Sequence, residues 1–378
     1  MKIKGKEKQI HKFVFVAGFM RVRLGDVCEK GSSNLKQSDV IDKNGEYEIY
    51  GASGLIGKVD FFHQEKPYIA VVKDGAGIGR TMLLPEKTSV IGTMQYILPN
   101  EKVIPKYLYY VIRYMHLEKY FTGATIPHIY FKDYKREEFN LCDLSEQEKI
   151  VSTLSKIEKI ITHRKQQLEK LDLLVKARFV EMFGDVATSD YKYPTKKLGD
   201  VANVGSSHRV FTKEFVETGI PFYRGTEIGE LANGIQPKEP FYISEEHYKK
   251  IADDETRPKK GDLLMPSICN KGQVWRVDTD EPFYYKDGRV LCVSADRKIY
   301  NTIFLQFFMR EKTIIEYPKI GSGSTFAEFK IFLLKDIDVL TPPLDLQTQF
   351  ADFVKQVDKS RFITSKEKIR RVKFYDKF

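Results

Sequence analysis

Cysteine is scarce in this sequence and is not clustered. The 378 residues contain four cysteines, Cys28, Cys142, Cys269 and Cys292, and no two of them stand in a C-x-x-C spacing. This pattern indicates neither a disulfide framework nor a cysteine-based zinc site. It is typical of a protein in a reducing compartment, and we therefore expect a cytoplasmic location.

Long apolar runs are also absent. No stretch reaches the roughly 18–20 apolar residues that a membrane-spanning helix needs. Residues 1–19 combine several lysines with a short apolar run, but no small-residue cleavage site precedes the charged segment Met20–Arg23. We interpret residues 1–19 as an N-terminal extension, with Met20 as a candidate true start, and we expect no membrane association.

Motifs of the common enzyme classes are missing as well. The sequence has no G-x-x-x-x-G-K-[ST] phosphate loop and no H-E-x-x-H zinc motif, and its seven histidines are scattered. The glycine-rich run 74–79 lacks the G-x-G-x-x-G spacing, and Thr341–Leu344 lacks the amide and the aromatic residue of the methyltransferase motif Asn-Pro-Pro-aromatic. We expect no catalytic residue, metal site or cofactor site in this chain.

Basic residues outnumber acidic ones. The chain has 62 Lys and Arg against 52 Asp and Glu, a formal net charge of +10. This excess fits a polyanionic partner such as DNA, and it fits plain solubility equally well. Hydrophobic residues make up 42% and aromatic residues 13% of the chain, enough to fill a sizeable core over two or three domains.

An internal repeat organises the chain. Leu24–Val27 recurs as Leu198–Val201, and each copy is followed by Gly-Ser-Ser at the same offset of 174. Further on, Gly123–Thr125 matches Gly323–Thr325 at an offset of 200, and the matches continue from Leu144 with Leu344. Matches in the same order at two steady offsets indicate a duplication, with a longer middle in the second copy.

Each copy has short β-rich runs followed by a long helical segment. The runs are 68–72, 81–84 and 94–98 in the first copy and 262–265, 274–277 and 290–293 in the second, and shorter helices are predicted over 105–119 and 301–311. This pattern predicts an α+β fold. The predicted domains are 20–144 and 185–344, each followed by a spacer helix, over 145–184 and 345–378.

The first spacer helix has the strongest pattern in the sequence. Ser145 and Glu148 form a candidate capping box, and Gly184 is a typical residue just after a helix end. Between them, apolar residues recur at alternating steps of four and three, which predicts a coiled-coil helix. The predicted seam comprises Ile150, Leu154, Ile157, Ile161, Leu168, Leu171 and Val175.

The second spacer helix has a weaker seam. It begins with Phe350, Val354 and Val357, and then meets Arg361 where an apolar residue is expected. A shift of one residue restores Phe362, Ile369 and Val372, but such a shift turns the apolar stripe by about 100°. We expect the end of this helix to pack poorly.

The order of these motifs resembles that of the specificity subunits of type I restriction–modification systems. The resemblance covers residues 20 to about 360 and rests on the duplicated Leu-Gly-Asp-Val start, a glycine-rich turn in each copy, the late Gly-(Ala/Ser)-Thr and the entry into each long helix. One departure is Cys142-Asp143, where the second copy has Pro342-Pro343, the more usual form in such subunits.

The resemblance implies a non-catalytic DNA-reading protein. It implies two target recognition domains that each read one half of a split double-stranded DNA sequence, and two antiparallel helices that hold them apart in a pseudo-twofold arrangement. It also implies two methyltransferase subunits and restriction–translocase subunits as partners. S-adenosylmethionine, ATP and Mg would then be bound by those partners, with no cofactor in this chain.

DNA contacts are expected from cationic and small polar residues in loops, because such groups bind phosphates and base edges. Each candidate could also be a solvated loop residue. The candidates in the first domain are Ser53, Lys58, Lys73, Arg80, Thr125 and His128, and those in the second are His208, Arg209, Arg224, Asn270, Lys271, Gln273, Ser324 and Thr325.

Other interpretations stay open at the level of sequence. The chain could be an orphan or inactive reader whose C-terminal helix is defective, or a stand-alone restriction or methylation enzyme with unrecognised motifs. The first spacer helix could also be an intramolecular scaffold without a partner subunit.

Overall fold

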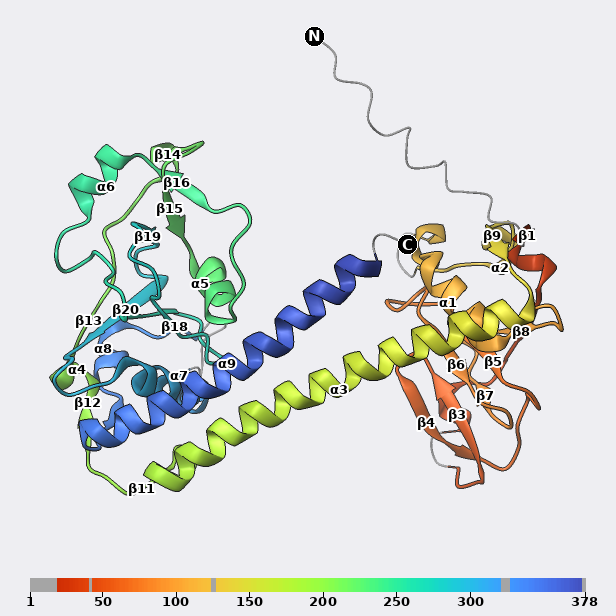
Figure 1. The fold of residues 1–378 in the computed structure, drawn as a ribbon, viewed down its shortest axis with the longest axis horizontal. Helices are drawn as coiled ribbons and strands as arrows, with labels where there is room; N and C mark the ends of the chain where they lie inside the picture. Colours follow the sequence, from red (N-terminus) through yellow and green to blue (C-terminus); the bar gives the residue numbers. More distant parts are fainter. Residues whose placement is uncertain (1–18, 41–42, 124–126, 321–326, 376–378) are drawn as a thin grey trace, which may run out of the picture. The chain divides into compact units, whose positions relative to one another are not determined.

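The computed structural model describes residues 19–40, 43–123, 127–320 and 327–375, with 362–375 as backbone only. The chain divides into two compact units, unit 1 up to Thr162 and unit 2 from His163 onward. The division falls inside a long helix, α3 (Leu144–Phe183), whose two halves belong to different units (Figure 1). Each unit is described by itself below.

Unit 1 is built on two small sheets. The main sheet is antiparallel, with the order β2 (Cys28–Ser32), β8 (Met94–Pro99), β5 (Tyr68–Val72) and β6 (Thr81–Leu84). The second sheet has the order β4 (Gly54–Val59), β3 (Tyr47–Gly51) and β7 (Ser89–Val90), and β1 (Met20–Arg23) pairs with β9 (Glu138–Leu141). The helical elements are η1 (Leu24–Asp26), η2 (Gln37–Asp39), α1 (Pro105–Tyr114), η3 (Leu117–Tyr120) and α2 (Phe131–Tyr134).

Unit 2 repeats this plan. Its main sheet has the order β13 (Ala202–Gly205), β20 (Val290–Ala295), β17 (Leu263–Pro266) and β18 (Trp275–Arg276), and its second sheet β14 (Phe215–Val216), β16 (Phe241–Ile243), β15 (Ile220–Tyr223) and β19 (Tyr284–Tyr285). Two strand pairs join β12 (Thr195–Lys197) to β21 (Asp338–Leu340) and β10 (Gly184–Asp185) to β11 (Asp190–Tyr191). The helices are α4 (Leu198–Val201), η4 (Thr212–Glu214), α5 (Gly225–Ala232), α6 (Glu245–Ile251), α7 (Thr302–Ile320), α8 (Ile331–Lys335) and α9 (Leu344–Tyr375).

The duplicated Leu-Gly-Asp-Val motif has the same role in both units. The backbone N–H of Leu24 donates to the Glu137 carbonyl, and that of Leu198 donates to the Ile337 carbonyl, each at 2.8–2.9 Å. A Cβ on Gly25 would lie 3.3 Å from the Lys135 carbonyl oxygen, so a bulkier residue would crowd this contact. The α+β class and the duplication are thus confirmed.

The predicted first spacer helix is present, but its cap was misplaced. Helix α3 begins at Leu144, and the Asp143 carboxylate accepts a hydrogen bond from the Glu146 N–H at 3.0 Å. This bond lowers the pKa of the Asp143 carboxyl. Asp143, not Ser145, is therefore the capping residue, whereas Gly184 ends the helix as predicted, with a φ of +97°.

Two shorter helices differ from their predicted lengths. Helix α1 ends at Tyr114 instead of 119, because His116 adopts a φ of +51°, which a helix cannot contain. Helix α7 runs nine residues past the predicted 311, to Ile320. Its extra turns are stabilised by an ion pair of Lys312 with Glu316 at 3.1 Å and by the buried Thr313.

Within unit 2, the C-terminal half of α3 packs antiparallel to α9. Phe179 meets Phe350 with ring centroids 5.4 Å apart, and about three turns further along α9 Arg361 pairs with Asp172 of α3. Of the predicted seam residues, Leu171, Val175, Phe350, Val354 and Val357 pack in or against the hydrophobic core of unit 2. In unit 1 Ile150 packs against the core, Leu154 and Ile157 are half-buried, and Ile161 is 53% exposed. Leu168, in unit 2, is also half-buried. The predicted shift to Phe362, Ile369 and Val372 lies outside the described side chains.

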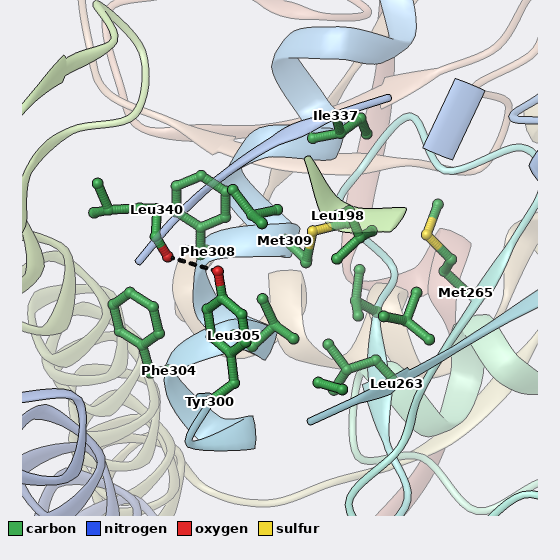
Figure 2. Close-up of a cluster of buried hydrophobic side chains, with 14 of the residues drawn as sticks. Leu198, Leu263, Met265, Tyr300, Phe304, Leu305, Phe308, Met309, Ile337 and Leu340 are labelled. Atoms are coloured by element: carbon green, nitrogen blue, oxygen red, sulfur yellow. Dashed lines mark hydrogen bonds between the residues drawn. The ribbon is translucent and has the colours of Figure 1, made fainter. Parts of the chain in front are cut away.

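The core of unit 2 joins α7 to the main sheet and to both long helices. Phe304 and Phe308 of α7 are fully buried beside Leu263, and the Tyr300 hydroxyl donates to the Leu340 carbonyl at 3.1 Å (Figure 2). Phe179 contributes a ring stacked at 5.6 Å on Phe304. Unit 2 and its helix pair thus share one hydrophobic core.

A buried glutamine connects each unit to its long helix. Gln147 accepts a hydrogen bond from the Ile104 N–H at 2.9 Å and donates to the carbonyls of Lys102 and Cys142 at 3.0 and 2.9 Å. Gln347 repeats the three bonds, from the Asn301 N–H and to two carbonyls, at 2.8–2.9 Å. Both side chains are fully buried. Each glutamine therefore fixes the start of a long helix to the start of α1 or α7.

Loss of this glutamine should destabilise only its own unit. In Q347A, one N–H and two carbonyls lose their buried partner, and we expect a loss of about 2–4 kcal/mol in the free energy of unfolding. Trp275 is the one tryptophan of the chain and lies in unit 2, so its fluorescence in urea reports that unit. Q147A, on α3 in unit 1, should leave the tryptophan transition unchanged. Q356A, at an exposed position of α9, the helix that also carries Gln347, should also leave it unchanged. If Q347A and Q147A shifted the urea transition of Trp275 equally, the two glutamines would not stabilise their units separately.

Candidate nucleic-acid interface

In unit 1, two loops are joined by their backbones. The loop between β5 and β6 begins at Lys73, and its Gly75 N–H donates to the Pro127 carbonyl at 2.9 Å. The Ile129 N–H donates to the Lys73 carbonyl, also at 2.9 Å, and Asp74 and His128 form an antiparallel bridge. These bonds place the glycine-rich turn and the segment after η3 side by side, whatever their side chains.

His128 is held in a fixed orientation at this junction. Its Nδ1 lies 2.7 Å from the Asp74 carboxylate, and Lys73 Nζ lies 3.7 Å from the same carboxylate. The imidazole is inclined at only 24° to the ring of Tyr130, and Lys132 lies over that ring at 5.2 Å. Two of the predicted contact residues, Lys73 and His128, thus belong to one partly exposed cluster.

Arg80 extends this cluster to the other sheet. Its guanidinium donates to the Ala52 carbonyl at 3.0 Å, in the turn between β3 and β4 that also carries the exposed Ser53. The structure therefore brings Ser53, Lys73, Arg80 and His128 to one edge of unit 1. Lys58 stands on β4 opposite Glu48, outside this set. Thr125 lies outside the described residues.

In unit 2, the Gly-Ser-Ser segment after β13 is held by its own hydroxyls. Ser206 donates to the Val290 carbonyl at 2.8 Å, and Ser207 donates to the Tyr285 carbonyl at 2.6 Å. The next residue, His208, donates its backbone N–H to the Tyr284 hydroxyl at 3.0 Å. The segment is therefore fixed against β19 and β20, and it presents His208 and Arg209 to solvent.

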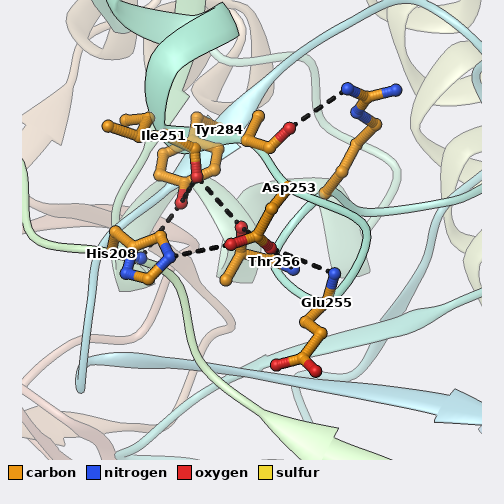
Figure 3. A network of polar contacts seen from close by, with 8 residues as sticks. His208, Ile251, Asp253, Glu255, Thr256 and Tyr284 are labelled. Atoms are coloured by element: carbon orange, nitrogen blue, oxygen red, sulfur yellow. Dashed lines mark hydrogen bonds and ion pairs between the residues drawn. The ribbon is translucent and has the colours of Figure 1, made fainter.

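His208 pairs with an aspartate that is itself held in place (Figure 3). His208 Nε2 lies 3.0 Å from Asp253, and Asp253 also accepts bonds from the Glu255 N–H and from the N–H and hydroxyl of Thr256, at 2.8–3.0 Å. The hydrogen bond with His208 and those with Thr256 hold the pKa of Asp253 far below its usual range. The carboxylate stays ionised and fixes the imidazole.

The two predicted arginines of unit 2 differ in how strongly they pair with carboxylates of the protein. Arg209 is 68% exposed and lies 3.4 Å from Asp287. Arg224 binds Glu227 through two nitrogens, and this contact raises the pKa of Arg224. Arg209 is therefore the freer cation, while part of the Arg224 fork is already occupied.

A pocket in unit 2 is lined by further cationic side chains. Asn270 and Lys271 are exposed beside it, and the Gln273 side chain accepts a hydrogen bond from the Lys271 N–H at 3.0 Å. Ser324 and Thr325 lie outside the described residues. The pocket is lined by Arg224, Ser267, Ile268, Gln273, Lys286 and Arg289.

Sequence reasoning missed Ile268, Lys286 and Arg289 because they come from separate segments of the chain. Ile268 follows β17, whereas Lys286 and Arg289 lie between β19 and β20. Only the antiparallel pairing of β17 with β20 brings these segments together. A charge or spacing pattern within one segment could not have indicated the pocket.

The cysteines are buried in both units. Burial raises the pKa of the Cys28 thiol to about 12 and that of Cys269 to about 11, so neither is a reactive thiolate at neutral pH. Among the described residues, three or more metal-ligating side chains nowhere come together. In the same part of the chain, every helix is too short or too polar to cross a bilayer.

Two repeated α+β units, each with cationic residues in its loops and each joined to a long helix, are the arrangement that the resemblance to DNA-specificity subunits predicts. The chain belongs to the family of the type I restriction modification DNA specificity domain, whose model matches residues 17–172 and 189–373.

Relatives of this chain carry the same description. A putative type I restriction enzyme specificity subunit of Haemophilus influenzae is 21% identical over 85% of this chain and 82% of its own length. The MjaVIII specificity subunit of Methanocaldococcus jannaschii is 24% identical over 79% and 74%. A solved S subunit from M. genitalium, 17% identical, has the same fold with a TM-score of 0.61 over 97% of this chain and 96% of that one.

The Asp253 network should make unit 2 sensitive to acid. Because the pKa of Asp253 is depressed in the folded state, its contribution to stability is present above about pH 4 and is lost as the pH falls below it. We expect D253A to lower the urea midpoint of Trp275 fluorescence at pH 7 and the difference from the wild type to shrink towards pH 3. D254A removes the neighbouring exposed carboxylate and should have no such effect. A D253A difference independent of pH would contradict the assignment.

Proposed function

We propose that this chain reads both halves of a bipartite DNA target for a type I restriction–modification complex. Unit 1 binds one half-site with the edge that carries Ser53, Lys73, Arg80 and His128. Unit 2 binds the other with the edge that carries His208, Arg209 and the Lys286–Arg289 pocket. The observation that carries the proposal is the duplicated scaffold with cation-bearing loops at corresponding edges.

The long helices would set the distance between the half-sites. A helix of 40 residues, such as α3, is about 60 Å long at 1.5 Å per residue. One turn of B-DNA is about 34 Å, so a helix of this length can serve as a spacer over one to two turns. The base pairs between the two half-sites would then be free of sequence requirements.

We propose that the chain itself performs no chemistry. Two methyltransferase subunits and restriction–translocase subunits would bind it, and they would supply S-adenosylmethionine, ATP and Mg chemistry. The complex would act on chromosomal DNA in the cytoplasm. The names of the relatives support this proposal, as does a second solved neighbour, titled as a study of complex assembly in the type I R-M system, with a TM-score of 0.53.

Co-expression with a methyltransferase subunit of a type I restriction–modification system tests the proposal. We expect a complex with two methyltransferases per chain by native mass measurement, and N6-methyladenine at one bipartite sequence by single-molecule sequencing. A stable complex without methylation at any defined sequence would refute DNA reading. Failure to form a complex would instead favour the orphan interpretation with a defective C-terminal helix.

Arg209 should contribute a phosphate contact without sequence preference. In R209A, the complex should bind specific and nonspecific duplexes more weakly by the same factor, because a phosphate contact carries no base information. The slope of log K against log salt should become shallower by about 0.9. Titrations between 50 and 200 mM salt measure this slope. K298A, which removes an exposed cation between β20 and α7, is the matched control and should change neither the affinity nor the salt slope. A change of target sequence in R209A would exclude a phosphate role.

A further inference from the structure

The two units share one backbone junction at the end of a central strand. In unit 1 the Lys73 carbonyl, just after β5, accepts from the Ile129 N–H at 2.9 Å, and the Lys73 N–H donates to Thr93. In unit 2 the Ser267 carbonyl, just after β17, accepts from the Phe329 N–H at 2.8 Å, and the Ser267 N–H donates to Arg289. Lys73 therefore corresponds to Ser267.

Because backbone groups make these bonds, the side chains at the junction are free to differ. By the same correspondence Asp74 matches Ile268, and His128 matches Glu328. Unit 1 places an aspartate–histidine pair at this point. Unit 2 places an exposed isoleucine there, while Glu328 is occupied by ion pairs with Arg289 and Lys330. The scaffold is constant and the chemistry it presents is not.

The side chains that remain available have opposite characters. His128 is 37% exposed, and with Nδ1 committed to Asp74 its Nε2 is the ring nitrogen left to bind another group. Ile268 is 40% exposed on the rim of the Lys286–Arg289 pocket, where an isolated apolar side chain contributes nothing to the core. A hydrogen-bonding group in one unit and an apolar group in the other suit two different base edges.

We propose that this junction is the position at which each unit reads a base pair in the major groove. In unit 1 the Nε2 of His128 hydrogen-bonds to a base edge, and Asp74 is its positioning residue. In unit 2 the side chain of Ile268 packs against a thymine methyl group, which is the apolar feature of the major groove. This inference rests on the proposed function and assigns one specificity residue to each half-site.

The test is the methylated sequence itself, measured by single-molecule sequencing of DNA modified by the complex with its methyltransferases. H128F keeps a ring but removes the nitrogens, and we expect it to lose discrimination at one base pair of one half-site by at least about tenfold. I268A should do the same at one base pair of the other half-site. H116A replaces an exposed histidine of unit 1 outside the junction and should leave the target unchanged.

Asp74 is tested by rescue. D74A releases Nδ1 of His128, and we expect a smaller relaxation at the same base pair as in H128F. D74N keeps an oxygen that can accept a hydrogen bond from the Nδ1–H of His128 and should restore much of the discrimination. A purely structural role for Asp74 would change the yield of complex and not the preferred base.

Four outcomes would overturn the proposal. H128F and I268A could both retain the wild-type target, or both could relax the same half-site. A uniform loss of affinity with an unchanged target would assign these residues to phosphates or to folding, which thermal unfolding of the complex distinguishes. If the wild-type complex formed but methylated no defined sequence, the proposed function would fail, and this inference with it.

Discussion

The buried glutamine at the start of each long helix is the joint on which the architecture depends. Gln147 and Gln347 each bridge three backbone groups that belong to two connections of the chain. Two of the three partners stand 43–48 residues away in the sequence, and the third stands 5 residues away. A side chain with both donors and an acceptor is needed, since neither a carboxylate nor an apolar residue could satisfy all three groups. A DNA-reading unit can position its base-contacting side chains only if it is rigidly attached to its spacer helix. The glutamine amide provides this attachment.

Beyond the joint, the two units separate rigidity from recognition. Backbone bonds hold the strand-end loops, the hydroxyls of Ser206 and Ser207 hold their segment to backbone carbonyls, and the Asp253 carboxylate fixes the exposed ring of His208. The exposed groups therefore lose little conformational entropy when they meet a partner, because they are already ordered. The same division explains how one scaffold can occur twice in a chain with different side chains at its edges.

Much of this could be predicted from the sequence, and what could not has a physical reason. The duplication, the strand runs and the end at Gly184 follow from local patterns. The cap did not, because Asp143-x-x-Glu146 and Ser145-x-x-Glu148 are equally good capping patterns two residues apart. His116 ends α1 by adopting a positive φ, which cannot be predicted from the residue type. The pocket around Ile268 and Arg289 is formed by strands that pair across the sheet, so only the fold reveals it.

The two copies build the same turn by different means. Before α3, the carboxylate of Asp143 caps the helix by hydrogen bonding, and its effect depends on ionisation. Before α9, Pro342 and Pro343 restrict the chain covalently, and the Pro343 carbonyl accepts from Leu346 and Gln347. The first turn is stabilised in the folded state, and the second also by a smaller conformational freedom of the unfolded chain. A change of pH can thus affect the capped start of α3 and leave the start of α9 unaffected, an asymmetry that duplication by itself would not create.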